Sequence, residues 1–252
     1  MRVWAHGRLI DADDPVYTAA DPVPTHGLGL FETCAVRDGV VLDLGQHLAR
    51  LTRSAAALGL TVDLGQVRAG VEAVLDAHVG RVRITVGSSR GPVVVAGPRE
   101  DRPHPTARRS PWVRNERSPL AGHKSTSYAA DALALADARR HGADEALLAD
   151  TRGHLSEGST SNVWVEIDGE LLTPSLDSGC LPGIMRELVL DHEPTARATQ
   201  LPWSVLDRVS AGEAGLAISN ALRGLVPVSA LDGVPVAVTP LIARAGALIR
   251  RR

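Results

Sequence analysis

The sequence has 252 residues, of which 44% are apolar and 22% charged, and its formal net charge is -2. This length suffices for one large or two smaller domains with buried cores, and the near-neutral charge excludes a strongly basic nucleic-acid or membrane surface. Two cysteines, Cys34 and Cys180, are too few for a disulfide framework, and neither a leader nor an apolar stretch of about 20 residues is present. We therefore expect a soluble cytoplasmic protein without a nucleic-acid or membrane partner.

Strand and helix signals alternate through the first hundred residues. Apolar or alternating segments predict strands over 2–5, 31–37, 40–42, 82–86 and 93–96. Apolar residues at helical spacing predict helices over 46–58 and 67–79. The turn dipeptide Asp38-Gly39 predicts a hairpin, and the break at 89–92 separates the last two strands. Residues 1–106 are thus expected to form an α+β domain.

A segment rich in proline and arginine separates this domain from the second half of the chain. Its prolines exclude a long helix, so 107–119 is predicted to be an interdomain connection, in which 107–114 could still include a strand. Beyond it, helices are predicted over 127–141, 183–190 and from 240 to the basic end, and strands over 145–149, 163–167, 170–173, 214–219, 226–231 and 234–237. Residues 120–252 should form a second domain, which makes the protein an α/β protein.

The basic residues are distributed unusually, because 26 of the 27 are arginines and only Lys124 is a lysine. Arginine keeps its proton in a protein, whereas a lysine amine can lose it and act as a nucleophile or a base. Lys124 either performs chemistry that arginine cannot, or is a chance survivor at an exposed position. Its place just before the helix predicted at 127 would present the amine at a loop-to-helix junction.

Two further segments, and one arginine, each allow a functional and a structural interpretation. Residues 156–162 contain a carboxylate and small polar residues that suit a bound group or an ordinary hairpin turn. Residues 179–186 run through Pro-Gly into a helix, whose first N–H groups can bind phosphate, although such a pair is often only a turn. Arg50 lies on the helix face of His47 and Ser54 and is either a surface charge or a cation for the same anion.

Together these features meet the requirements of pyridoxal 5'-phosphate. The aldehyde of this cofactor needs a lysine, its ring nitrogen needs an acid, and its phosphate needs N–H groups and a cation. The combination is more specific than any of its parts, and no metal is expected.

The sequence resembles the fold-type IV pyridoxal-phosphate enzymes, which include branched-chain aminotransferases, D-amino acid aminotransferases and aminodeoxychorismate lyases. The resemblance covers nearly the whole chain in seven ordered blocks: Phe31-Glu32-Thr33, His47 to Leu51, Ser89-Arg90-Gly91, Lys124 to Tyr128, Glu157-Gly158 with Ser161-Asn162, Leu181 to Arg186, and Ser219-Asn220-Ala221 with Pro227-Val228. It implies a fold like that of D-amino acid aminotransferase, a homodimer, and a cofactor in the cleft between two domains.

The resemblance also implies roles for particular residues. Lys124 is the catalytic Schiff-base lysine, Arg50 binds the phosphate, and Glu157 faces the pyridine nitrogen. Leu181 packs on the ring, and the phosphate side is lined by Ile184, Met185, Asn220 and Ala221. Gly91 is followed by Pro92 rather than by a loop rich in glycine and arginine, so the candidates for binding substrate carboxylates are His26, Arg90 and Arg223. A structural role is the alternative for each of these three.

Two blocks favour one activity within the family. Gly-Ile-Met-Arg at 183–186, with Met185 where aminotransferases more often have Thr, and Ser-Asn-Ala-Leu-Arg-Gly at 219–224 resemble the aminodeoxychorismate lyases. Such a lyase converts 4-amino-4-deoxychorismate to 4-aminobenzoate and pyruvate, a step toward folate. The alternative is an aminotransferase for D-amino or branched-chain amino acids, which shares every cofactor residue. A non-catalytic binding protein is disfavoured because Lys124 and Glu157 are both present.

Overall fold

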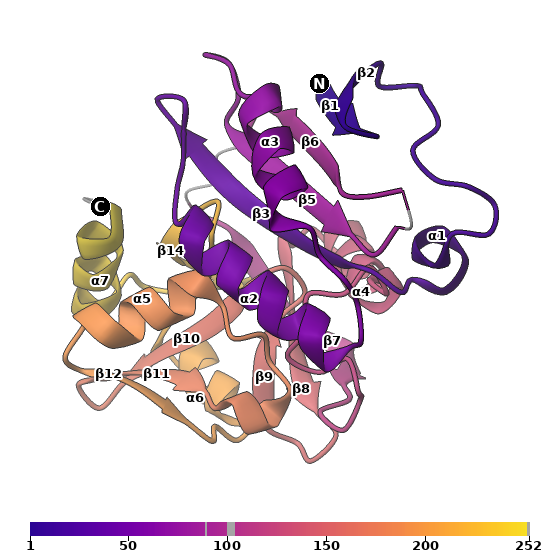
Figure 1. Ribbon diagram of the computed structural model, residues 1–252. Helices are drawn as coiled ribbons and strands as arrows, with labels where there is room; N and C mark the ends of the chain where they lie inside the picture. The colour runs from indigo at the N-terminus through magenta and orange to yellow at the C-terminus, as the bar shows by residue number, and fades with distance from the viewer. Residues whose placement is uncertain (89, 100–103, 251–252) are drawn as a thin grey trace. The chain divides into compact units, whose positions relative to one another are not determined.

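The computed structural model describes residues 1–88, 90–99 and 104–250, with the backbone alone at residue 250. The chain forms two compact units (Figure 1). Unit 1 comprises Met1–Glu100 and His123–Tyr128, and unit 2 comprises Asp101–Gly122 and Ala129–Arg252. Both units combine helices with sheets, which confirms the predicted α/β class. Within the described ranges, no helix is long and apolar enough to span a membrane.

Unit 1 is built on a six-stranded antiparallel sheet in the order β2-β1-β6-β5-β3-β4. Its strands are β1 (Arg2–Ala5), β2 (Arg8–Ile10), β3 (Leu30–Arg37), β4 (Val40–Val41), β5 (Arg81–Val86) and β6 (Val93–Gly97). Its helices are α1 (Pro22–His26), α2 (Leu44–Ala57) and α3 (Leu64–Val74). The β3–β4 hairpin has Asp38 and Gly39 at φ 51° and 75°, as the predicted Asp-Gly turn requires.

The alternation of buried and less buried side chains along β5 shows which face of this sheet is buried. Val82, Ile84 and Val86 belong to the core that α2 and α3 cover (Figure 1), so Arg83 and Thr85 lie on the opposite face. Helix α3 ends at Val74 rather than at 79. The chain is extended at Leu75, and the Asp76 carboxylate then binds the N–H of His78 and the Arg2 guanidinium.

Unit 2 contains two five-stranded sheets. One has the order β16-β15-β7-β8-β9 and consists of β7 (Thr106–Arg114), β8 (Glu145–Asp150), β9 (Leu155–Gly158), β15 (Ala230–Leu231) and β16 (Val234–Pro235). The other has the order β12-β11-β10-β13-β14 and consists of β10 (Asn162–Ile167), β11 (Glu170–Pro174), β12 (Ala196–Thr199), β13 (Gly215–Asn220) and β14 (Gly224–Pro227). The helices are α4 (Ala129–Arg140), α5 (Ile184–His192), α6 (Val205–Ser210), α7 (Pro240–Arg250) and the 3-10 turn η1 (Leu176–Ser178).

Side-chain alternation along β10 explains the layers of unit 2. Val163 and Val165 join the core between the two sheets, where α6 also packs. Trp164 points the other way, into the core formed with α5 and α7, and its indole N–H donates to the Ser219 hydroxyl at 2.9 Å. Helix α4 covers the outer face of the first sheet through Ala134 and other small residues. Helices therefore flank a pair of packed sheets.

Two predicted segments differ from the structure because long-range pairing overrides the local pattern. Residues 107–119, predicted as a connection that could include a strand over 107–114, contain most of β7, which pairs in parallel with β8 and belongs to unit 2. Residues 226–231, predicted as one strand, divide between sheets. Val228 still donates its N–H to Leu216 beside β13, whereas the next residue, Ser229, donates to Pro105 beside β7.

Candidate active site

The lysine predicted to be catalytic lies against the sheet of unit 1, although residues 120–252 were expected to form the second domain. The Phe31 N–H donates to the Lys124 carbonyl at 2.8 Å, and Leu30 forms an antiparallel bridge with Ser125. These contacts bring the Lys124 ammonium over the Phe31 ring, with Nζ 4.5 Å from the ring centroid. Since α4 begins only at Ala129, the backbone next to β3, rather than a helix start, positions the amine.

A tight turn fixes the segment that carries this lysine. The Gly27 carbonyl accepts from the Thr126 hydroxyl at 2.7 Å and from the Ser127 hydroxyl at 3.2 Å. Gly27 has φ 64°, and a Cβ there would overlap Ser127, so only glycine fits this position without strain. His123 adds a contact to α2, with its Nδ1 3.0 Å from the Ser54 hydroxyl.

Arg83 also lies against the Phe31 ring that Lys124 contacts. This contact was not predicted from the sequence. The centre of its guanidinium lies 3.7 Å from the ring centroid, and the Tyr128 ring meets Phe31 edge-on at 5.4 Å. Burial lowers the pKa of Arg83, because desolvation disfavours its charge. In residues 1–88, 90–99 and 104–250, no carboxylate forms an ion pair with it. The alternation of β5 could have indicated that Arg83 lies on the face away from the core.

Arg50 is not the surface charge that a lone helical arginine suggests. It is 4% exposed, and it donates from Nε to Glu32 Oε1 at 2.9 Å and from Nη2 to Glu32 Oε2 at 2.6 Å. The His47 Nδ1 lies 2.6 Å from the same carboxylate. Burial alone would raise the pKa of Glu32, but the hydrogen bonds from His47 and Arg50 outweigh it and lower that pKa.

In unit 2, Glu157 is held from two sides. Its Oε2 accepts from the Leu181 N–H at 2.9 Å, and its Oε1 lies 3.0 Å from Nη2 of Arg114. The same Arg114 nitrogen donates to Asp131 at 2.6 Å. Glu157 and Leu181, both predicted as cofactor residues, are thus in direct contact. Arg114 and Asp131 were not predicted from the sequence. Their proximity to Glu157 depends on the pairing of β7 with β8 and on the packing of α4.

The polar segment 156–162 is not a simple turn, since its first three residues belong to β9. The buried Glu145 carboxylate binds the hydroxyls of Ser159, Thr160 and Ser161 and the Thr160 N–H. Asn162 then donates from Nδ2 to the Leu181 carbonyl at 2.8 Å. These bonds hold the β9–β10 connection and the segment before α5 in one arrangement around Glu157.

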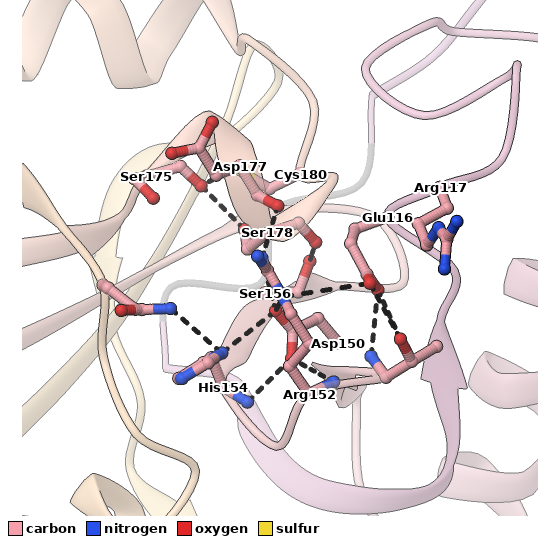
Figure 2. Close-up of polar contacts among 12 residues, drawn as sticks. Glu116, Arg117, Asp150, Arg152, His154, Ser156, Ser175, Asp177, Ser178 and Cys180 are labelled. Atoms are coloured by element: carbon pink, nitrogen blue, oxygen red, sulfur yellow. Dashed lines mark hydrogen bonds and ion pairs between the residues drawn. The ribbon is translucent and has the colours of Figure 1, made fainter.

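Figure 2 shows a second polar network, which supports the same segment from the β8–β9 turn. Asp150 accepts from the Arg152 side chain and from the N–H groups of Arg152 and His154. Arg152 also donates to the Asp177 carbonyl at 2.7 Å, and the Ser156 hydroxyl donates to the Ser178 carbonyl at 2.8 Å. The 3-10 turn before Leu181 is therefore anchored to the strand that carries Glu157.

Helix α5 begins as a phosphate-binding helix would. Its N-cap is Gly183, which offers no side-chain cap, and a Cβ at Gly183 would overlap the Asn162 side chain. The side chains of Ile184 and Met185 pack into the apolar core, so these two residues can contribute to an anion site only through their N–H groups.

The end of β13 and the turn that follows hold the remaining predicted cofactor residues, Asn220 and Ala221. The Asn220 side chain accepts from the N–H groups of Leu222 and Arg223 and donates to the Thr160 carbonyl at 3.3 Å. This side chain therefore stabilises the turn itself. Within the described ranges, the buried Nη1 of Arg223 has no hydrogen-bond partner.

The other two candidates for binding substrate carboxylates are exposed. His26 lies at the end of α1, with its Nδ1 2.7 Å from the Thr25 hydroxyl. Arg90 is exposed on the β5–β6 connection, where its N–H donates to Ser88. Neither forms a hydrogen bond or ion pair with Lys124 among the described residues, whereas Arg83 lies against the same ring as Lys124.

Comparison with known proteins connects this arrangement to one family. Residues 29–231 match the family described as Amino-transferase class IV. A D-alanine aminotransferase of Listeria innocua is 28% identical over 94% of this chain and 90% of its own length. A bifunctional aminodeoxychorismate lyase / D-amino acid transaminase of Mycobacterium tuberculosis is 29% identical over 69% of this chain and 71% of its own. A branched-chain aminotransferase structure from Thermoproteus uzoniensis is 26% identical, with a TM-score of 0.82, and covers 100% of this chain and 94% of its own.

These relatives carry three different activity names on one fold, so the match identifies the family and not the reaction. The match covers most of the chain, from β3 to β15, and includes Lys124, Glu157 and the start of α5. The chain therefore belongs to the class IV aminotransferase family, the fold-type IV enzymes that depend on pyridoxal 5'-phosphate.

Proposed function

We propose that the protein is a 4-amino-4-deoxychorismate lyase, which forms 4-aminobenzoate and pyruvate. The observation that carries the proposal is the pair of cations on the Phe31 ring, Lys124 at 4.5 Å and Arg83 at 3.7 Å from the centroid. A reactive amine and a half-buried guanidinium that lie against the same aromatic ring suit a substrate that has an amino group and carboxylates, as this one does. The two sequence blocks at 183–186 and 219–224 and the bifunctional relative support the lyase over other activities of the family.

The chemistry of the donor set fits the cofactor. Lys124 supplies the amine that would hold it covalently, and Glu157, fixed by Arg114 and the Leu181 N–H, supplies the acid for the ring nitrogen. Arg50 and the N–H groups of Ile184 and Met185 would hold the phosphate. The buried Nη1 of Arg223, without a partner in the part of the chain that the structure describes, is a further donor for an anion.

The mechanism follows from what these residues can do. The bound cofactor supplies an aldehyde that condenses with amines and a ring that accepts electrons. Lys124, whose amine can act as a base, would remove the proton from the substrate carbon that bears the amino group. Glu157, ion-paired with Arg114, would hold a proton on the ring nitrogen. Lys124 is also the residue that would protonate the departing enolpyruvyl group, whose loss makes the ring aromatic.

Arg83 and Arg223 would bind the two carboxylates of this substrate. Arg83 has lost part of its hydration against Phe31, so an anion can replace that hydration at low cost. Arg223 combines a buried, unpaired Nη1 with a backbone fixed by Asn220. We propose these two residues in preference to His26 and Arg90, which are exposed.

The test is a turnover assay without any keto acid. Purified protein loaded with pyridoxal 5'-phosphate is added to enzymatically generated 4-amino-4-deoxychorismate, and 4-aminobenzoate is detected by its fluorescence. We expect product from the wild type, and none from Lys124→Ala or Lys124→Arg, because a guanidinium cannot lose its proton. Product from either variant would contradict the role of Lys124.

An aminotransferase for D-amino or branched-chain amino acids is the second candidate, and the D-alanine aminotransferase that covers 94% of this chain favours it. It would use the same cofactor residues but return a proton to the cofactor and release a keto acid. D-alanine and leucine, each with 2-oxoglutarate, are the substrates to assay. Cofactor loading with keto acid formation, but without 4-aminobenzoate, would reject the lyase and support this candidate.

A further inference from the structure

The buried carboxylate of Glu32 has no role in the chemistry described so far. Glu32 lies on β3 and is 1% exposed. Its neighbours in sequence, Phe31 and Thr33, lie on the sheet face that carries Arg83, so strand alternation directs Glu32 to the opposite face, toward α2. There it binds the Arg50 fork and His47, which lie one turn apart on that helix.

Stability alone does not account for this buried charge. In many proteins, the free energy needed to remove a carboxylate and a guanidinium from water is as large as the free energy gained from their attraction. A protein with apolar residues of similar volume in their place can be equally stable or more stable. The same face of the sheet is otherwise lined by apolar residues such as Cys34, Val82 and Ile84. We therefore infer that the Glu32 carboxylate acts through its effect on its partner, Arg50.

The contacts fix the orientation of Arg50. Bonds from Nε and Nη2 to the two carboxylate oxygens define both the plane of the guanidinium and its rotation in that plane. They use one edge of the group, and the second donor edge, which includes Nη1, is then directed away from Glu32. His47, bound to the same carboxylate, restricts the rotation of Glu32. A lysine could not be held in this way, since its ammonium has no planar fork.

We propose that Glu32 is the positioning residue of the cofactor phosphate site: it orients Arg50, with His47 as its support, and thereby sets the affinity for the phosphate group. This inference rests on the proposed role of Arg50 as a phosphate ligand. It assigns Glu32 no contact with the cofactor or the substrate.

The test compares two ligands that differ only in the phosphate. Apoprotein is titrated with pyridoxal 5'-phosphate and with pyridoxal, and binding is followed by the absorbance of the cofactor joined to Lys124. We expect Glu32→Gln to weaken binding of pyridoxal 5'-phosphate by roughly tenfold or more, as loss of an orienting carboxylate does at other ligand sites. Binding of pyridoxal should change by less than about twofold.

Three further variants separate orientation from a general loss of structure. Arg50→Gln should show the same selective loss, and the double variant Glu32→Gln/Arg50→Gln should be no weaker than Arg50→Gln alone, because both changes remove one interaction. Arg50→Lys keeps the charge but lacks the fork, and should also lose affinity selectively. Asp21→Asn is the matched control, a carboxylate in unit 1 that is equally buried at 1% exposed and binds Val23 and Ser88 instead.

Each outcome decides between the proposals. Equal weakening of both ligands by Glu32→Gln, multiplying effects in the double variant, or unchanged phosphate affinity would overturn the positioning role. If Glu32→Gln does not fold, Arg50→Lys carries the test on its own, and unchanged selectivity there would also overturn it. If Arg50→Gln does not distinguish the two ligands, Arg50 does not bind phosphate. Selective binding effects without 4-aminobenzoate formation would reject the lyase and leave the role of Glu32 intact.

Discussion

At the scale of one residue, Arg114 is a cation in direct contact with Glu157, the proposed partner of the ring nitrogen. Its Nη2 lies 2.6 Å from Asp131 and 3.0 Å from Glu157, so one cation neutralises two carboxylates. In Arg114→Gln the carboxylates of Glu157 and Asp131 would both remain, but the cation between them would be gone. The repulsion between the two negative charges would then favour the protonated form of Glu157. A neutral Glu157 holds the ring-nitrogen proton poorly, so we expect turnover to fall by roughly tenfold or more, as for other orienting partners of ligand-binding groups. Steady-state kinetics between pH 6 and 9, at saturating cofactor, would measure this loss.

A second change distinguishes charge from packing at this position. In Arg114→Gln/Asp131→Asn the competing carboxylate is gone, so Glu157 regains part of its ionised character. We expect the double variant to recover a measurable part of the lost turnover, and the loss in the single variant to diminish as the pH rises. A loss that is independent of pH and not relieved by Asp131→Asn would show that Arg114 acts only through packing.

At the scale of one element, the start of α5 depends on the absence of a side chain at Gly183. Its φ of -72° suits any residue, but a Cβ would overlap the Asn162 side chain, whose amide binds the Leu181 carbonyl. We expect Gly183→Ala to destabilise the fold by roughly 1 to 3 kcal/mol, the usual cost of overpacking, and to weaken cofactor binding. Urea unfolding and a cofactor titration would measure the two effects.

Gly45 provides the matched control for this prediction. It lies in the first turn of α2, where an added Cβ would meet no atom of the described residues within 4 Å apart from its chain neighbours and the backbone of its own helix. Gly45→Ala should leave cofactor binding unchanged and stabilise the fold by up to about 1 kcal/mol, because alanine favours the helix. Similar destabilisation by both substitutions would contradict the steric explanation for Gly183.

For the molecule as a whole, the ion pair between Glu193 and Arg244 links the end of α5 to α7. Arg244 donates to the two Glu193 oxygens at 2.6 Å and 3.0 Å, and these bonds, together with those from Thr195, lower the pKa of Glu193 from 4.5 to about 2. A carboxyl group whose pKa is lowered by folding stabilises the folded state at pH values above its ordinary pKa. This stabilisation is lost as the pH falls through the lowered pKa. Glu193→Gln should therefore be less stable than the wild type by roughly 1 to 3 kcal/mol at pH 7.

The pH dependence is the decisive part of this measurement. The difference in unfolding free energy between wild type and Glu193→Gln should be constant above the ordinary pKa of 4.5 and shrink toward pH 2. Urea unfolding at several pH values, followed by circular dichroism, would measure it. Asp168→Asn, at an exposed pair with Arg208, should show a much smaller difference. A difference for Glu193→Gln that does not change with pH would contradict the role of the charge.

Local sequence patterns predicted most helices and strands, because turn residues and the spacing of apolar residues act over a few neighbouring positions. The Asp-Gly turn at 38–39 formed the expected hairpin with a left-handed Asp, and the strands predicted over 163–167 and 170–173 pair with each other. Helical spacing predicted α2 and α5 to within a few residues. The short α1, β2 and α6 were not predicted, although the Asp21 cap and the left-handed Gly27 are local signals that could have indicated α1.

The sequence by itself determined the chemistry available to this protein. A single lysine, a carboxylate in a polar segment and an uncapped helix start were visible in the residues, and their order indicated the family that residues 29–231 match. Only the tertiary structure decided which groups control them. Arg83 and Lys124, which lie against the same Phe31 ring, are 41 positions apart in the chain. Glu32 and Arg50 are 18 positions apart, and Arg114 and Glu157 are 43 positions apart. Strand pairing and helix packing create these contacts, and such pairing depends on the whole core and not on any local pattern.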